Sequence, residues 1–144
     1  MAGGIAGGIT GVGPHRFALR VYYEDTDLAG LVYYANYLKF IERARSEWVR
    51  DCGVDQTTLR AAGRVFAVRR LTADYLSPAR FDDLLEVRTE VTGFSGARIH
   101  LHQEVCRDEK PLFRATVDLV CLTDQGLASR IPADIRQKLF PAQE

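Results

Sequence analysis

The sequence predicts an α+β fold in which one long helix lies against an antiparallel sheet of about five strands. The first observation behind this fold class is a single strongly amphipathic helical pattern over residues 36–52. The second is a series of strand patterns joined by connections too short for parallel crossovers. The 144 residues are 47% hydrophobic and 26% charged, which fits one soluble globular domain with one core.

The first strand is predicted over residues 17–24. Hydrophobic and polar side chains alternate there with a period of two, as in a strand that buries one face. The apolar set is Phe17, Leu19, Val21 and Tyr23. The preceding residues 1–15 are rich in glycine and lack the continuous apolar core of a secretory signal, so we expect a disordered tail before a single domain over residues 16–144.

A change of period to three and four residues predicts the long helix over residues 36–52. Asn36 can cap its start, and Gly53 can supply the left-handed residue that ends it. A short second helix is expected over residues 56–62, with Asp55 as its cap and Gly63 as its stop. One helix of this length covers one face of a five-stranded sheet.

Four further strands are predicted after Gly63, and a short helix containing Pro132 near its start is predicted to follow them. The four strands are expected over residues 65–75, 84–92, 98–106 and 112–122. Apolar residues on both faces of some of these strands, such as Leu84 and Leu85, favour burial against a second copy. We therefore expect a homo-oligomer, either a dimer or a tetramer.

Composition excludes several classes of function. The formal net charge is zero, so bulk electrostatics does not draw the chain to nucleic acid. No apolar run approaches the ~20 residues of a transmembrane helix. Three cysteines without metal-ligand spacing are expected to be reduced and structural, which favours a cytoplasmic location.

Familiar catalytic motifs are absent from the sequence. No serine lies in a Gly-x-Ser-x-Gly elbow, and neither the dinucleotide fingerprint nor the phosphate-binding loop occurs. His100 and His102 lie on one face of a predicted strand and could hold a metal with Glu104. Exposed polar positions explain these histidines better, because no further ligand is indicated nearby.

The loop between the first strand and the long helix carries three carboxylates. Glu24 is expected on the polar face of the strand and Asp25 at a chain turn, both solvated. Asp27 is followed by the apolar residues 28–32, which should fold against the sheet and bring it to the helix N-terminus. Asp27 is therefore either a reactive carboxylate or a residue that caps the helix or bridges the loop.

The segment DTDLAGLVYYANYL, residues 25–38, resembles the signature of hotdog-fold acyl-CoA thioesterases of the 4-hydroxybenzoyl-CoA thioesterase type. Within this family it looks most like the small thioesterases associated with the Tol-Pal system of Gram-negative bacteria. The likeness continues through residues 42–45, 73–83 and 93–103 and covers roughly residues 16–140. It implies a long central helix wrapped by an antiparallel sheet.

The resemblance implies that Asp27 is the catalytic carboxylate, either as nucleophile or as base for a water. It further implies that the backbone N–H of Tyr34 polarises the thioester carbonyl and that no metal or prosthetic group is needed, coenzyme A being part of the substrate. Members of the Tol-Pal group often carry His where this chain has Tyr34. Four further positions of the motif are expected to contact substrate: Gly30, Val32, Tyr33 and Asn36.

Arginines supply the remaining candidates. Arg80, Arg98 and Arg130 could bind the phosphates of coenzyme A, because guanidinium groups form paired hydrogen bonds with phosphate. Arg45 falls on the apolar stripe of the long helix, where it needs a partner. We expect a structural pairing with a carboxylate such as Asp74 or Glu42; facing an acyl tunnel is the alternative.

The function expected from the sequence is hydrolysis of a short-chain or aromatic acyl-CoA. One alternative is a non-catalytic acyl-thioester-binding or scaffold protein that works with acyl carrier protein or envelope machinery. A second alternative is a dehydratase of 3-hydroxyacyl thioesters, which would need a histidine in the active-site loop. Residues 24–37 contain none.

Overall fold

The computed structural model describes residues 14–141, and residues 1–13 of the expected tail lie outside this range. Five antiparallel strands form one sheet in the order β1-β3-β4-β5-β2. The strands are β1 His15–Arg20, β2 Arg64–Tyr75, β3 Leu84–Ser95, β4 Arg98–Arg107 and β5 Lys110–Thr123. The predicted α+β class and strand number are confirmed.

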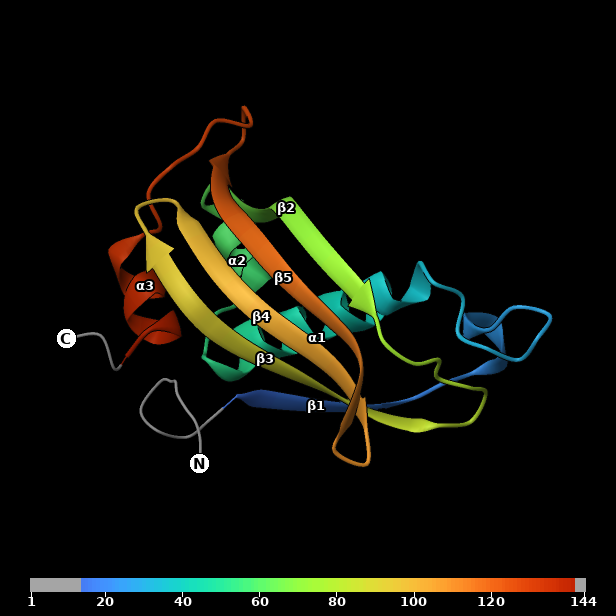
Figure 1. Cartoon of the computed structure of the whole chain (residues 1–144). Coiled ribbons are helices and arrows are strands. Elements are labelled where there is room, and N and C mark those ends of the chain that lie inside the picture. Colours follow the sequence, from blue (N-terminus) through green and yellow to red (C-terminus); the bar gives the residue numbers. More distant parts are fainter. Residues whose placement is uncertain (1–13, 142–144) are drawn as a thin grey trace.

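The described residues also form three α-helices: α1 Asn36–Asp51, α2 Gln56–Ala61 and α3 Ala133–Leu139. Helix α1 runs behind the sheet in the view of Figure 1 and packs against β1, β3 and β4. Its buried face includes Phe40, Ile41, Ala44 and Trp48, and these residues are spaced as the helical period predicts.

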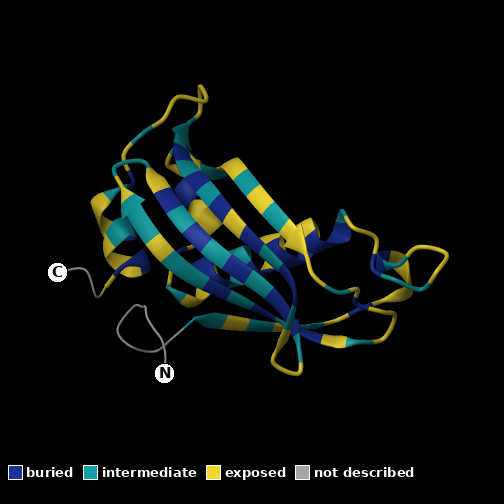
Figure 2. Cartoon of the chain, in the orientation of Figure 1, coloured by how far each residue is buried: buried dark blue, intermediate teal, exposed yellow. Residues whose placement is uncertain are grey.

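The core lies between α1 and the inner face of the sheet. Phe40 and Ile41 of α1 are fully buried together with Ile99 of β4 and Phe113 of β5. Figure 2 shows buried and exposed positions alternating along the strands, so the opposite face of the sheet is the more open one. Burial of this one apolar face holds the helix on the sheet.

Both predicted ends of the first strand are wrong. Strand β1 begins at His15 and ends at Arg20, and Tyr23–Asp25 form a 3-10 helix instead of continuing the strand. The physical reason is a local hydrogen bond: the Tyr22 N–H donates to Asp25 Oδ2 at 2.8 Å, which folds the chain back on itself. Aromatic residues in this stretch made the strand pattern look longer.

The helix boundaries follow the predicted signals with one exception. Gly53 has φ +89° after α1, and the Asp55 side chain accepts from the N–H groups of Thr57 and Thr58, as expected. Asn36 does not cap α1, because Ala35 occupies the N-cap position and no side chain bonds there. The Asn36 side chain points to Asp25 instead.

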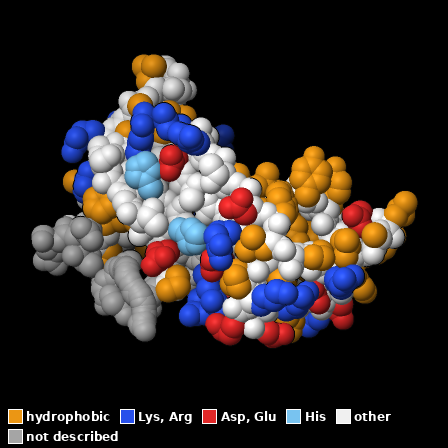
Figure 3. All heavy atoms as spheres, viewed as in Figure 1, with side chains coloured by type: hydrophobic (Ala, Val, Ile, Leu, Met, Phe, Trp, Pro, Cys, Tyr) orange, Lys and Arg blue, Asp and Glu red, His pale blue; other side chains and the backbone are white. Residues whose placement is uncertain are grey.

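The two edge strands are β1 and β2. Strand β2 presents a free edge of 12 residues within this chain, and Val65 and Val68 on it are exposed. Figure 3 shows charged and histidine side chains on the outer face of the sheet and hydrophobic side chains gathered at the end where the loop after β1 lies. Among the described residues, no helix is long and apolar enough to span a bilayer.

Candidate active site

The loop after β1 folds as a small hairpin. Thr26 pairs with Val32, and the Asp27 N–H donates to Leu31 O at 2.9 Å. Gly30 closes the turn with φ +78°, a conformation that glycine adopts without a steric penalty, and its N–H donates to Asp27 O at 3.0 Å. Asp27 thus occupies a defined position at the tip of this hairpin.

One oxygen of the Asp27 carboxylate is fixed and the other is open. Oδ1 accepts from the Ala29 N–H at 2.9 Å and from the Leu31 N–H at 3.2 Å. Within residues 14–141, Oδ2 makes no hydrogen bond or ion pair. The side chain is therefore oriented by its own loop while one oxygen stays available to a ligand.

The expected placement of Asp27 against the helix needs correction. The carboxylate is held by loop N–H groups rather than by those of α1. Leu28, which was expected to fold against the sheet, is fully exposed, whereas Val32 is 6% exposed and lies in the core. Only the end of the apolar stretch is buried, because the tight turn projects its beginning outward.

The carboxylate at the start of α1 is that of Asp25, which is 4% exposed and not a solvated turn residue as expected. Its Oδ1 accepts from the Asn36 amide at 2.9 Å, and its Oδ2 accepts from the Tyr22 N–H. The Tyr33 N–H donates to Asp25 O at 2.9 Å. Asp25 therefore joins the loop to the first turn of α1.

The turn that enters α1 leaves two backbone donors unpaired. Tyr33 O accepts from the Asn36 N–H at 2.8 Å, and Tyr34 O accepts from the Tyr75 hydroxyl at 3.0 Å. Neither the Tyr34 N–H nor the Ala35 N–H has an acceptor among the described residues. Free N–H groups at a helix start suit a ligand oxygen that carries negative charge.

Aromatic rings surround this turn. Tyr75 meets Tyr34 edge to face at 6.3 Å and Tyr37 at 5.6 Å, while Tyr37 stacks on Phe113 at 4.9 Å. The Tyr37 hydroxyl accepts from the Ala79 N–H. Tyr34 and Tyr75 are exposed and Tyr37 is buried, so the cluster extends from the surface into the core.

The structure brings one of the three candidate arginines to the hairpin. Arg80 pairs with Leu31, and the Phe81 N–H donates to Gly30 O at 3.1 Å. The Arg80 side chain is exposed. Its backbone position beside Gly30 makes it a neighbour of the Asp27 loop.

The other candidate positions lie elsewhere or point inward. Arg98 and Arg130 are near the β3–β4 turn, where the Ile131 N–H donates to Gly96 O; this turn is at the opposite end of the sheet from the Asp27 hairpin (Figure 1). Val32 is buried in the core, and the Asn36 amide is bonded to Asp25. Five members of the predicted set lie together at the hairpin end of the molecule, namely Asp27, Gly30, Tyr33, Tyr34 and Arg80. Val32 and Asn36 lie at the same end, but their side chains point inward.

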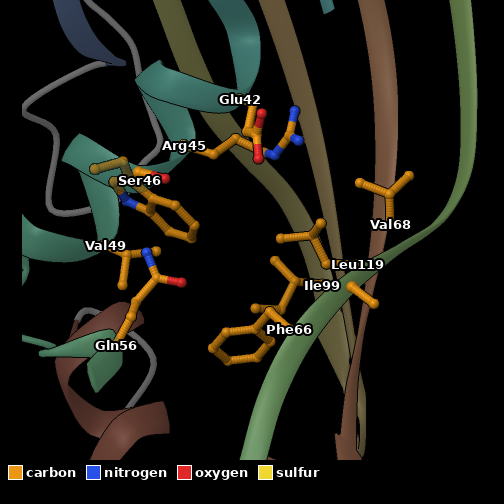
Figure 4. A pocket seen from close by; sticks show the side chains of 11 residues that line it. Glu42, Arg45, Ser46, Val49, Gln56, Phe66, Val68, Ile99 and Leu119 are labelled. Atoms are coloured by element: carbon orange, nitrogen blue, oxygen red, sulfur yellow. The ribbon is translucent and has the colours of Figure 1, made fainter. Parts of the chain in front are cut away.

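A cavity of about 300 Å³ lies farther along α1, beside β2. Phe66, Ile99 and Leu119 line its apolar side, and Figure 4 shows Arg45 reaching across from α1 beside Glu42. Arg45 Nη1 donates to Gln103 Oε1 at 3.1 Å, so the expected carboxylate partner is replaced by an amide. Burial lowers the pKa of Arg45, partly offset by the Glu42 charge.

The two sheet histidines have protein partners. His100 Nδ1 lies 2.7 Å from Asp118 Oδ1, and His102 Nε2 lies 3.5 Å from Glu104 Oε2. Over the described range of residues 14–141, no group of three or more His, Cys, Asp or Glu side chains has the geometry to hold a metal ion.

Sequence reasoning missed Tyr75 and Gln103. Tyr75 is the last residue of β2 and reaches the loop only because of tertiary packing, so no local pattern identifies it. Gln103 is fully buried, and its amide donates to Ile41 O and to Thr89 Oγ1. A polar residue within the buried face of a strand was the available signal for Gln103.

Comparison with known proteins gives consistent matches. A family model described as the thioesterase-like superfamily matches residues 21–139. The acyl-CoA thioester hydrolase YbgC of Escherichia coli O6:H1 is 39% identical over 128 residues, covering 85% of this chain and 96% of that protein. The acyl-CoA thioesterase YbgC of Haemophilus influenzae is 46% identical over 107 residues, covering 74% and 79%. A solved probable thioesterase from Bartonella henselae has a TM-score of 0.79 at 38% identity, covering 83% of this chain and 99% of that one.

Proposed function

The chain belongs to the thioesterase-like superfamily, and from this we propose that it hydrolyses acyl-CoA thioesters to a free acid and coenzyme A. The E. coli and H. influenzae relatives are named for acyl-CoA thioester hydrolysis. The antiparallel sheet around α1 is the hotdog architecture that the sequence motif implied. We assign the reaction to Asp27 and to the donors at the start of α1.

The observation that carries this assignment is that the loop before α1 holds both an oriented carboxylate and N–H groups without an acceptor among the described residues. The hairpin pairs Asp27 with Leu31 and Asp25 with Tyr33, and Tyr34 follows it directly along the chain. We propose that the thioester binds with its carbonyl oxygen about 3 Å from the Tyr34 N–H and its carbon about 3 Å from Asp27 Oδ2.

Two chemical courses fit this arrangement and give the same products. In one, Asp27 Oδ2 attacks the carbonyl carbon, the carbon–sulfur bond breaks with release of the coenzyme A thiolate, and water hydrolyses the acyl-aspartyl anhydride. In the other, Asp27 takes a proton from a water that attacks directly. The leaving group is good in both, so we propose no metal or prosthetic group.

The exposed tyrosines support a short-chain or aromatic acyl group. Tyr33, Tyr34 and Tyr75 offer ring faces next to the unpaired N–H groups, and their rings are 5.0 Å and 6.3 Å apart in successive pairs. A planar acyl group can stack on such rings. We propose that Arg80, which lies beside Gly30, binds a phosphate of coenzyme A.

A dimer or tetramer is part of the proposal. The free edge of β2 and the exposed apolar residues near the loop would be covered by another copy. Arg98 and Arg130, distant from Asp27 in one chain, could then reach substrate bound to a neighbouring subunit. We propose action in the cytoplasm on coenzyme A esters, with a Tol-Pal association and acyl carrier protein as further expectations from the family resemblance.

The test is the substitution Asp27→Asn. An asparagine Oδ1 can still accept from the Ala29 and Leu31 N–H groups, so the loop should persist. An amide NH2 group then replaces the open oxygen Oδ2. Release of free thiol from a panel of acyl-CoA substrates should fall roughly 10²- to 10⁴-fold. The unfolding midpoint should stay close to that of the wild-type protein.

The matched control is Glu24→Gln, an exposed carboxylate nearby on the same loop, which should keep wild-type turnover. Near-normal turnover of Asp27→Asn would remove Asp27 from the mechanism. Tight binding of acyl-CoA without thiol release by the wild-type protein would favour the non-catalytic alternative. Hydration or dehydration of 3-hydroxyacyl thioesters would favour the dehydratase.

A further inference from the structure

The bond between Tyr75 and Tyr34 O joins the end of β2 to the entrance of α1 across 41 residues of sequence. The Tyr75 hydroxyl donates at 3.0 Å to a carbonyl next to the two unpaired N–H groups of the site. A tyrosine that only filled space would not need this bond. Its ring is already packed against Tyr37 and Phe113.

Peptide geometry transmits this contact to the donors. Tyr34 O and the Ala35 N–H belong to one planar trans peptide and point in opposite directions. Fixing the carbonyl therefore fixes the direction of the Ala35 N–H. The preceding peptide, which carries the Tyr34 N–H, is held through Tyr33 O by the Asn36 N–H at 2.8 Å.

We propose that Tyr75 is a positioning residue that orients the Ala35 N–H, beside the Tyr34 N–H, for the developing oxyanion of the thioester. This inference rests on the proposed thioesterase function. The Tyr75 hydroxyl holds one of the two peptides in place, so the donors do not have to reorganise when negative charge forms on the carbonyl oxygen. Tyr75 acts through Tyr34 and makes no bond to the reacting atoms.

The surroundings of Tyr75 keep its hydroxyl a donor. Burial raises its pKa, and the neighbouring Tyr34 raises it further, so the group stays protonated in the neutral range. The hydroxyl can therefore donate to Tyr34 O from the neutral range up to mildly alkaline pH.

The test is Tyr75→Phe, which keeps the ring and removes the hydroxyl. We expect kcat for acyl-CoA hydrolysis to fall roughly tenfold with KM within about twofold, because ground-state binding is kept while transition-state stabilisation is lost. The affinity for a non-hydrolysable thioether analogue of the substrate should not change. Tyr23→Phe, at an exposed tyrosine whose hydroxyl makes no bond in the described chain, should leave kcat unchanged.

A second variant separates positioning from packing. Tyr75→Leu removes both ring and hydroxyl, so positioning predicts that Phe and Leu variants both lose kcat, whereas packing alone predicts that Tyr75→Phe behaves like the wild-type protein. Wild-type kcat in Tyr75→Phe would overturn the inference and leave the Asp27 assignment intact. Equal losses in kcat and in affinity for the thioether analogue would also overturn the inference. Absence of turnover by the wild-type protein would overturn both the inference and the proposed function.

Discussion

The side-chain amide of Asn36 donates to Asp25 Oδ1 at 2.9 Å, and this buried bond ties the first residue of α1 to the loop that carries Asp27. The second Asp25 oxygen accepts from the Tyr22 N–H at 2.8 Å. A buried carboxylate with two donors is satisfied, whereas the same donors without it would be left unpaired. Asp25 is therefore a structural residue, two positions before the residue proposed to react.

Replacing Asp25 with alanine should lower the free energy of unfolding by about 1–3 kcal/mol, because the Tyr22 N–H and the Asn36 amide lose their acceptor in a buried place. Denaturant unfolding followed by circular dichroism measures this change. Glu24→Ala, at the exposed neighbouring position, should stay within about 0.5 kcal/mol of the wild-type protein. Equal stabilities for the two variants would contradict the structural role of Asp25.

The contrast between Asp25 and Asp27 shows which features could be predicted from the sequence and which could not. Periodicity located α1 to within one residue and found all five strands, because each signal is local and repeats. The roles of the two aspartates depend on which N–H groups the folded loop presents, and no spacing in the sequence encodes this. The role of Tyr75 could not be predicted for a related reason: its partner Tyr34 lies 41 residues away in the sequence, and only the packing of the fold brings the two together.

A second prediction concerns Gln103, whose side chain connects the sheet to the middle of α1. Its amide donates to Ile41 O at 3.0 Å, and its Oε1 accepts from Arg45. A double-mutant cycle of Gln103→Leu and Arg45→Leu should therefore give a coupling energy of about 0.5–3 kcal/mol in unfolding experiments.

The comparison cycle pairs Gln103→Leu with Leu127→Ala, at an exposed position in the turn after β5. These two changes share no partner, so their effects should add within about 0.5 kcal/mol. Additive effects of the Gln103 and Arg45 variants would show that the Arg45 guanidinium contributes to the free energy of unfolding independently of the Gln103 amide.

A third prediction follows from Glu104 on the outer face of the sheet. Burial alone would raise the pKa of this carboxyl, but hydrogen bonds from Arg114 and His102 outweigh burial and leave the pKa lowered. The ionised form is thus favoured in the folded state. Its contribution to stability is fully present above the unfolded-state pKa of about 4.3 and is lost as the pH falls through the lower folded-state value.

Glu104→Gln should therefore be less stable than the wild-type protein at pH 7, and the difference should shrink as the pH falls below about 4. Unfolding curves at a series of pH values check this trend. Gln125→Glu places a carboxylate on an exposed turn and should leave the acid limb of the stability profile unchanged. A gap between Glu104→Gln and wild type that does not narrow in acid would contradict the assignment.

A fourth prediction distinguishes phosphate binding from a general effect on charge. Arg80→Ala should raise KM for acyl-CoA about tenfold, equivalent to about 1.4 kcal/mol, if its guanidinium meets a phosphate of coenzyme A. The same variant should show wild-type kinetics with acyl-pantetheine, which carries the thioester but no nucleotide phosphates. Arg136→Ala, on α3, serves as the control arginine. A change in KM that is equal for both substrates would exclude Arg80 from phosphate recognition.

The fifth prediction concerns the free edge of β2. Val65 and Val68 are exposed on this edge, and an uncovered strand of 12 residues is a template for pairing with another chain. If two copies meet there, lysines at both positions bring like charges together across the symmetry axis and oppose association. Light scattering coupled to size exclusion should then report a multiple of 16.1 kDa for the wild-type protein and about one chain mass for Val65→Lys/Val68→Lys.

Leu127→Lys, at an exposed hydrophobic residue away from β2, should keep the wild-type mass. Dissociation should also raise KM for acyl-CoA, because Arg98 and Arg130 lie at the end of the sheet opposite Asp27 and can serve a bound substrate only from a neighbouring copy. In the dissociated variant, adding Arg98→Ala should have no further effect on KM, whereas in the wild-type background it should weaken binding. A monomeric wild-type protein with full activity would place the whole site within one chain and leave Arg98 and Arg130 without a part in it.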